Sequence, residues 1–229
     1  MSYQTPALVQ SNNADVDTNP ANISLNNTPT LGDVIFAVIG VRDTNVTASV
    51  SSISQSGVTW TQQKAYDFPS AYSIAIEVWA GVVTSSSAST SISVTLGGTP
   101  DECWVMALEF SGILTASFLD QAAENFNTGS SAPDTGTTST TTQTYELWIG
   151  GFTDQTGPIS SPSNSFTLYG GSSATYGWGY CAAAYYVSTT TGTADCTAST
   201  SSSNSWIGCI ITVKAASANP LTYVRHWLW

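Results

Sequence analysis

Short apolar runs, divided by clusters of Ser, Thr, Gly and Pro, constrain this chain more than any other feature of its sequence. The run Val34–Val41 is continuously apolar, as in a core strand, whereas Ile74–Val83 and Ser91–Leu96 alternate between apolar and polar residues. Clusters such as Thr84–Thr90 and Gly97–Pro100 stand between the runs and predict turns. The pattern therefore predicts an all-β fold.

A second group of runs repeats the first, with loop lengths that differ. The similar stretches cover about residues 33–111 and 146–213, which we interpret as two halves of about five strands each. Four pairs of segments correspond: Asp33–Asp43 with Glu146–Asp154, Gly57–Trp60 with Ser165–Leu168, Gly81–Ser87 with Tyr185–Thr191, and Trp104–Ser111 with Trp206–Val213.

Two sheets of this size bury more apolar surface when they stack face to face than either does alone. We therefore expect one antiparallel β-sandwich over residues 1–218, jelly-roll-like and built from the two similar halves. The alternative is two small tandem sandwiches joined by the Ser- and Thr-rich stretch Thr128–Thr144. The one segment that allows a short helix is Leu114–Asn125.

The charge composition excludes several classes of function. The chain has four Lys and Arg against fifteen Asp and Glu, so no basic stripe exists to neutralise nucleic-acid phosphates. Its one His, His226, lies near the end of the chain, so the chain is poorly suited to His-based acid–base catalysis. We expect a protein that is not an enzyme, uses no cofactor and binds no nucleic acid.

Several strand motifs resemble those of a known group of modules. The segments Asp33–Val38, Gly57–Trp60, Glu77–Val83 and Trp206–Ile210 are similar to lectin-like jelly-roll modules. Such modules recur in bacteriophage structural proteins, as capsid decoration and tail-fibre parts, and in bacterial surface proteins. The resemblance covers about residues 5–215 and implies a jelly-roll fold with no shared catalytic residues.

Two acidic features suggest chemistry that the charge composition does not exclude. Glu77 and Glu109 lie in expected strands, and a pair of carboxyl groups could serve glycoside hydrolysis, with Trp79 stacking on a sugar. The simpler interpretation places both acids on the solvent face of one sheet. The stretch Asp15–Asn19 has the first three ligand positions of a calcium loop but lacks the later Gly and acid, so we expect a solvated acidic loop and no metal site. The alternative is a calcium site shared with Asp101 or Glu102.

Aromatic residues gather in two loops at corresponding places in the two halves. Rigid aromatic rings among small polar residues suit contact with sugars, although they equally suit subunit contacts or hairpin packing. The candidate sugar contacts are Trp60, Tyr66, Phe68, Tyr72, Tyr176 and Trp178.

The last residues, 219–229, form a separate aromatic tail. Such a terminus is costly to leave in water, so we expect it to pack as a last strand on its own domain or to dock on a neighbouring subunit. The candidate assembly residues are Tyr223, Arg225, His226, Trp227 and Trp229.

Four cysteines are present, and none forms a Cys-x-x-Cys pair. Cys196 and Cys209 flank a polar turn, so they could face each other in a hairpin and form a disulfide; the alternative is four buried thiols.

The start of the chain has no basic or apolar leader, and no apolar run is long enough to span a bilayer. We therefore expect a structural protein of a virus particle, either a capsid decoration or a tail or fibre component. Its partners would be further copies or other virion proteins, and its location the virion or an extracellular surface. The alternative is a carbohydrate-binding adhesin or lectin module.

Overall fold

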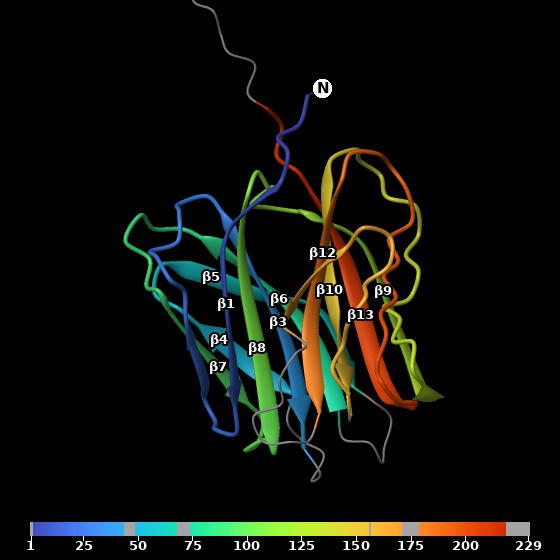
Figure 1. The fold of residues 1–229 in the computed structure, drawn as a ribbon. Coiled ribbons are helices and arrows are strands. Elements are labelled where there is room, and N and C mark those ends of the chain that lie inside the picture. The colour runs from blue at the N-terminus through green and yellow to red at the C-terminus, as the bar shows by residue number, and fades with distance from the viewer. Residues whose placement is uncertain (1, 44–48, 68–73, 156, 171–178, 219–229) are drawn as a thin grey trace, which may run out of the picture.

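The computed structural model describes residues 2–43, 49–67, 74–155, 157–170 and 179–218. The described residues form antiparallel strands without a helix (Figure 1). The first large sheet has the order β1-β8-β3-β6-β5, and its strands are β1 (Ala7–Val16), β8 (Glu102–Ser111), β3 (Val34–Arg42), β6 (Ile74–Val83) and β5 (Val58–Asp67). The second has the order β11-β12-β10-β13-β9, and its strands are β11 (Thr167–Gly170), β12 (Tyr180–Ser188), β10 (Glu146–Asp154), β13 (Asn204–Lys214) and β9 (Leu119–Ser130).

The two large sheets stack face to face and enclose the main core. Alternate residues of β3, such as Val34 and Phe36, enter this core together with Leu147 and Ile149 of β10. The other face of the first sheet is covered by a small sheet with the order β2-β7-β4, whose strands are β2 (Ala21–Ser24), β7 (Ser91–Leu96) and β4 (Val50–Ser54). Figure 1 shows these layers side by side.

The outer face of the second sheet is covered by chain that forms few regular strands. Ile159, Phe166 and Cys196 pack there against Trp148 and Phe152 of β10. Both large sheets are therefore covered on both faces, which explains why β3, β8, β10 and β13 are apolar almost without interruption.

The two halves have the same strand order. If β3 corresponds to β10, β6 to β12, β8 to β13 and β5 to β11, then the order β1-β8-β3-β6-β5 matches β9-β13-β10-β12-β11. Within the main core β8 faces β12 and β6 faces β13, and β3 and β10 begin at the same end (Figure 1). The halves are thus related by an approximate two-fold axis along the strands.

Local details follow the same correspondence. The edge strands β1 and β9 carry an extra residue near their starts, Val9 and Asp120, where the pairing register shifts. A residue with positive φ stands near the start of β3 and of β10. Gly32, two residues before β3, has a φ of 91°, and Tyr145, directly before β10, has a φ of 60°. The repeat therefore includes β1 and β9, which lie outside the stretches predicted from the sequence.

The antiparallel β-sandwich predicted from the sequence is confirmed. The jelly-roll winding stays a prediction, because β5 pairs with β6 in the large sheet rather than extending the small sheet beside β4. The predicted short helix at Leu114–Asn125 is wrong, since β9 begins at Leu119. The stretch Thr128–Thr144 ends β9 and then pairs with the segment around Cys196, so it covers the second sheet rather than linking two domains.

Candidate functional site

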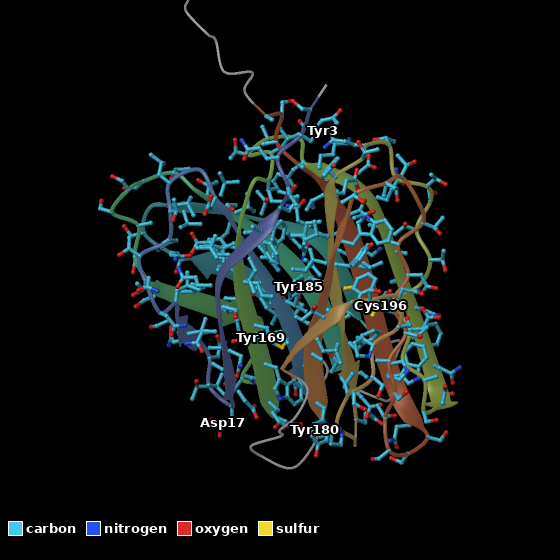
Figure 2. The ribbon with its side chains drawn as sticks, turned by 45° about the horizontal axis from the view of Figure 1, so that its top comes forward. Tyr3, Asp17, Tyr169, Tyr180, Tyr185 and Cys196 are labelled. Atoms are coloured by element: carbon cyan, nitrogen blue, oxygen red, sulfur yellow. The ribbon has the colours of Figure 1, made fainter. Side chains whose placement is uncertain are left out.

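The strands that flank the two aromatic loops end together at one end of the molecule. Asp67 ends β5, and Tyr180 begins β12. Figure 2 shows Tyr180 and Asp17 at the end opposite Tyr3. The predicted sugar contacts within the loops, Phe68, Tyr72, Tyr176 and Trp178, lie outside the described residues, as do Tyr223, Arg225, His226, Trp227 and Trp229 of the tail.

The two described sugar-contact candidates both take part in packing. The ring of Trp60 lies so close to Gly81 of the neighbouring strand that a Cβ at Gly81 would be 2.7 Å from it, and Trp60 also packs against the core beneath the small sheet. Tyr66 meets Phe126 of β9 with ring centroids 6.0 Å apart, and burial and the Glu124 carboxylate raise its pKa.

Lys64, two residues before Tyr66, forms an ion pair with Glu124. The contacts Lys64–Glu124 and Tyr66–Phe126 both join β5 of the first half to β9 of the second. This side of β5 therefore packs against β9 at one edge of the sandwich, and Tyr66 is half-buried there.

Glu77 is fully buried and accepts three hydrogen bonds. The backbone N–H of Val50 donates to Oε1 at 2.7 Å, and Nε2 of Gln62 and Nε1 of Trp79 each donate to Oε2 at 2.7 Å. These three donors fix the position of the carboxyl group. Glu77 thus ties β6 to β4 and β5.

Glu109 is also fully buried, with the Thr30 N–H donating to Oε1 at 2.7 Å and Nε2 of Gln10 donating to Oε2 at 2.5 Å. Glu77 lies opposite Ile39 of β3 and Glu109 lies opposite Ile35, on strands either side of β3. The two residues are offset by four residues along the strands and by two strand spacings across the sheet, which places their Cα atoms about 16 Å apart.

That separation is far more than the 5–9.5 Å or so that two carboxyl groups need to act together in glycoside hydrolysis. The geometry therefore does not bring the predicted glycosidase pair together. The simpler interpretation is corrected as well: both acids share one face, but the small sheet covers that face.

The cysteines are free thiols, and the predicted Cys196–Cys209 disulfide is wrong. Cys209 lies on β13 opposite Gly151 and Glu124, whereas Cys196 belongs to the outer layer, where it exchanges hydrogen bonds with Thr135 (Figure 2). The two residues therefore do not face each other in a hairpin. Burial raises the pKa of Cys196 to about 12, which keeps this thiol neutral and unreactive.

The acidic stretch Asp15–Asn19 serves to hold strands together. The Asn19 side chain donates to the carbonyls of Leu96 and Gly98 at 3.0 Å each and accepts from the Leu96 N–H at 3.0 Å. Within the described ranges, no group of three or more His, Cys, Asp or Glu side chains is placed to hold a metal ion.

Two pairs of carboxyl groups were not anticipated from the sequence. Asp33, just before β3, lies beside Glu109 of β8; burial, and then the Glu109 carboxylate, raise the pKa of Asp33 to about 6. Glu146, the first residue of β10, lies beside Asp120 of β9; burial, and then the Asp120 carboxylate, raise the pKa of Glu146 to about 7.

Asp33 and Glu146 occupy corresponding places in the two halves, because each stands one residue before the first core residue, Val34 or Leu147. Their partners do not correspond, since Glu109 lies on β8, whereas Asp120 is the extra residue of β9 and corresponds to Val9 of β1. A sequence signal for this correspondence exists. Leu8-Val-Gln10 and Leu119-Asp-Gln121 share Leu and Gln on either side of the extra residue, which would have placed Asp120 next to the start of β10.

Comparison of the chain with protein-family models, with curated proteins and with solved structures gives no match in any of the three. In the part of the chain that the structure describes, no helix has the length and apolar character needed to cross a membrane.

Proposed function

We propose that this chain is a non-enzymatic structural protein of a virus particle, either a capsid decoration or a tail or fibre component. The observation that carries the proposal is the use that the fold makes of its acidic residues. Glu77 and Glu109, the best candidates for catalysis, instead accept hydrogen bonds that join neighbouring strands. This supports a protein in which the buried acids stabilise the fold, and in which function depends on the surface.

The attachment of the aromatic tail supports a role in assembly. The segment before the tail is fixed to the body, since the Ala218 N–H donates to the Ser2 carbonyl at 2.9 Å and Ser217 pairs with Tyr3. Residues 219–229 continue from this anchored point and contain two of the eight Trp in the chain. We propose that they dock on a second copy or on another virion protein, at the particle or an extracellular surface.

Carbohydrate binding is the second candidate function. It is favoured by one observation, namely that β5 and β12 bring the two aromatic connections to the same end of the molecule. In this alternative, the loops around Phe68, Tyr72, Tyr176 and Trp178 contact glycans of a host surface, and the tail packs on its own domain.

The mass in solution of the full chain and of a chain ending at Ala218 distinguishes the two. The shorter chain keeps the pairing of Ser217 with Tyr3, so it is expected to fold, which a thermal melt checks. A full-length oligomer that becomes a folded monomer on truncation supports assembly through the tail. A control with Trp227→Ser and Trp229→Ser at full length separates loss of the rings from loss of chain length.

Two folded monomers would contradict assembly of the chain with itself through the tail. A glycan array with the same two proteins then tests the alternative. Binding that is unaffected by truncation and is lost on Tyr72→Ser together with Trp178→Ser would support the carbohydrate function.

A further inference from the structure

The last strand of the fold ends beside a buried pair of acids. Glu146 lies directly opposite Lys214, the last residue of β13. Asp120, the extra residue of β9, accepts hydrogen bonds from the Thr142 N–H and hydroxyl at 2.6 Å each, and its Oδ1 lies 3.0 Å from Nζ of Lys214. Lys214 therefore forms an ion pair with Asp120 and stands opposite Glu146 in the sheet.

Glu146 itself is fully buried, and neither of its carboxyl oxygens has a hydrogen-bond partner of good geometry. Burying an ionised carboxylate without donors costs several kcal/mol, so such a group keeps its proton. Its neighbour Asp120 is well supplied with donors and holds the negative charge of the pair. The packing is thus that of a singly ionised pair.

The backbone around this pair secures the end of the chain. Lys214 donates its N–H to the Phe118 carbonyl at 2.8 Å, and its own carbonyl accepts from the Leu114 N–H at 3.0 Å. The next residue, Ala215, donates to the Tyr145 carbonyl at 3.1 Å, next to Glu146. Any movement that hydrates Glu146 therefore disturbs the hydrogen bonds that hold residues 214–218.

We propose that Asp120 and Glu146 form a proton-dependent latch on the C-terminal end of β13. While the pair holds one proton, β9, β10 and β13 stay packed and residues 214–218 are held. When Glu146 ionises, its buried charge draws water between the strands, and residues 214–218 detach from the body. This inference concerns the folded chain alone and stands whether or not the tail serves in assembly.

The charges around the pair set the direction of the switch. Among the described residues, the cation that faces it is Lys214, while the neighbours Ser188 of β12 and Thr212 of β13 are uncharged. Burial and the Asp120 carboxylate raise the pKa of Glu146, and the Thr212 hydroxyl and the Lys214 ammonium lower it. The raising effects are larger, so the pKa of Glu146 is about 7. The latch is therefore closed in acid and opens above neutral pH.

The pKa of Asp120 is shifted in the opposite direction to that of Glu146. Burial alone would raise its pKa, but hydrogen bonds from Thr142 and the Lys214 ammonium lower it. It therefore stays ionised throughout the range in which Glu146 loses its proton. Asp33, beside Glu109 on the other large sheet, is the second buried acid whose pKa is raised, which makes it the internal control.

Hydrogen exchange followed by mass spectrometry tests the latch on the full chain at roughly pH 5.5 and pH 8.5, corrected for the intrinsic exchange rate. Peptides covering residues 211–218 and 113–121 are expected to lose protection at least about tenfold at the higher pH, while peptides of β7, which contains neither acid pair, lose less. The variant Glu146→Gln keeps the side-chain volume but cannot ionise, so its protection is expected to be the same at both pH values.

The control Asp33→Asn removes the buried acid of the other large sheet and is expected to leave the pH dependence of residues 211–218 intact. If Glu146→Gln does not fold, the pKa of Glu146 is read in the unaltered chain from its carboxyl-carbon chemical shift. Equal protection of residues 211–218 at both pH values, a pH dependence that persists in Glu146→Gln, or an ordinary pKa for Glu146 would each overturn the proposal.

Discussion

Substituting Gly40 by alanine tests how the two large sheets pack. A Cβ at Gly40 would lie 2.6 Å from Sγ of Cys181, 2.7 Å from Oγ1 of Thr153 and 2.8 Å from Cβ of Cys181. Thr153 and Cys181 belong to β10 and β12 of the other sheet. Since such atoms normally stay about 3.5–4 Å apart, the sheets would have to separate locally by about 1 Å.

The obstructing side chains are short and buried, so neither can swing away as a long flexible side chain would. Overpacking of a core costs about 1–3 kcal/mol, and we expect Gly40→Ala to fall in the upper part of that range, at about 2–3 kcal/mol. For a chain of this size, this corresponds to a fall in melting temperature of about 4–12 °C.

Intrinsic tryptophan fluorescence during heating measures this change. Gly129→Ala on β9 is the matched control, because the nearest atom to its new Cβ is Oγ of Ser203 at 3.9 Å, and it should be neutral or slightly stabilising. In a chain that already carries Cys181→Ala, Gly40→Ala should cost less, because the closest obstructing atom is gone. If Gly40→Ala melts within about 1 °C of the unaltered chain, the packing of the sheets through β3, β10 and β12 is wrong.

Three further predictions follow from buried groups. The free energy of unfolding should fall as the pH rises from about 4 to 7 and then level off, because folded Asp33 and Glu146, with pKa values of about 6 and about 7, hold protons that the unfolded chain has already lost. Each group contributes at most about 3 kcal/mol, and less where water reaches it. The double variant Asp33→Asn with Glu146→Gln should flatten the pH profile measured by denaturant titration. Glu77→Gln should destabilise the chain by about 2–4 kcal/mol, because it puts an NH₂ group among three donors. The control Glu124→Gln, which breaks a partly exposed ion pair, should cost under about 1 kcal/mol. Equal melting temperatures of the two variants would contradict this. The four thiols should not react with dithionitrobenzoate in the native chain and should all react after unfolding without reductant, whereas two unreactive cysteines would indicate a disulfide.

Strand positions could be predicted because hydrophobic period is a local property. The continuous run Val34–Val41 coincides with a strand buried on both faces. The error at Leu114–Asn125 has a local cause as well, since Ala122, Ala123 and Glu124 are good helix formers. Their place in β9 is decided by pairing with β13, which the segment itself does not encode.

The environment of the acids could not be predicted, because it depends on long-range pairing. Alternation shows that Glu77 points away from Ile76 and Val78, but not that β4 of another sheet supplies an N–H on that side. The pairs Asp33–Glu109 and Asp120–Glu146 likewise join segments that meet only through strand register. A carboxyl group's role therefore becomes visible only once the sheet order is known.

The differences between the halves show how single residues shape a repeated fold. In the first half, Gly81 lets the ring of Trp60 lie on the neighbouring strand, and β5 stays paired with β6 over its whole length. The corresponding position in the second half is Tyr186, whose ring meets Phe166 with centroids 5.7 Å apart. Because Phe166 is drawn into that aromatic cluster, regular pairing with β12 begins only at Thr167, and β11 is four residues long. One half thus has a long β5 and a regular small sheet, while the other has a short β11 and an aromatic outer layer, although both follow the same strand order.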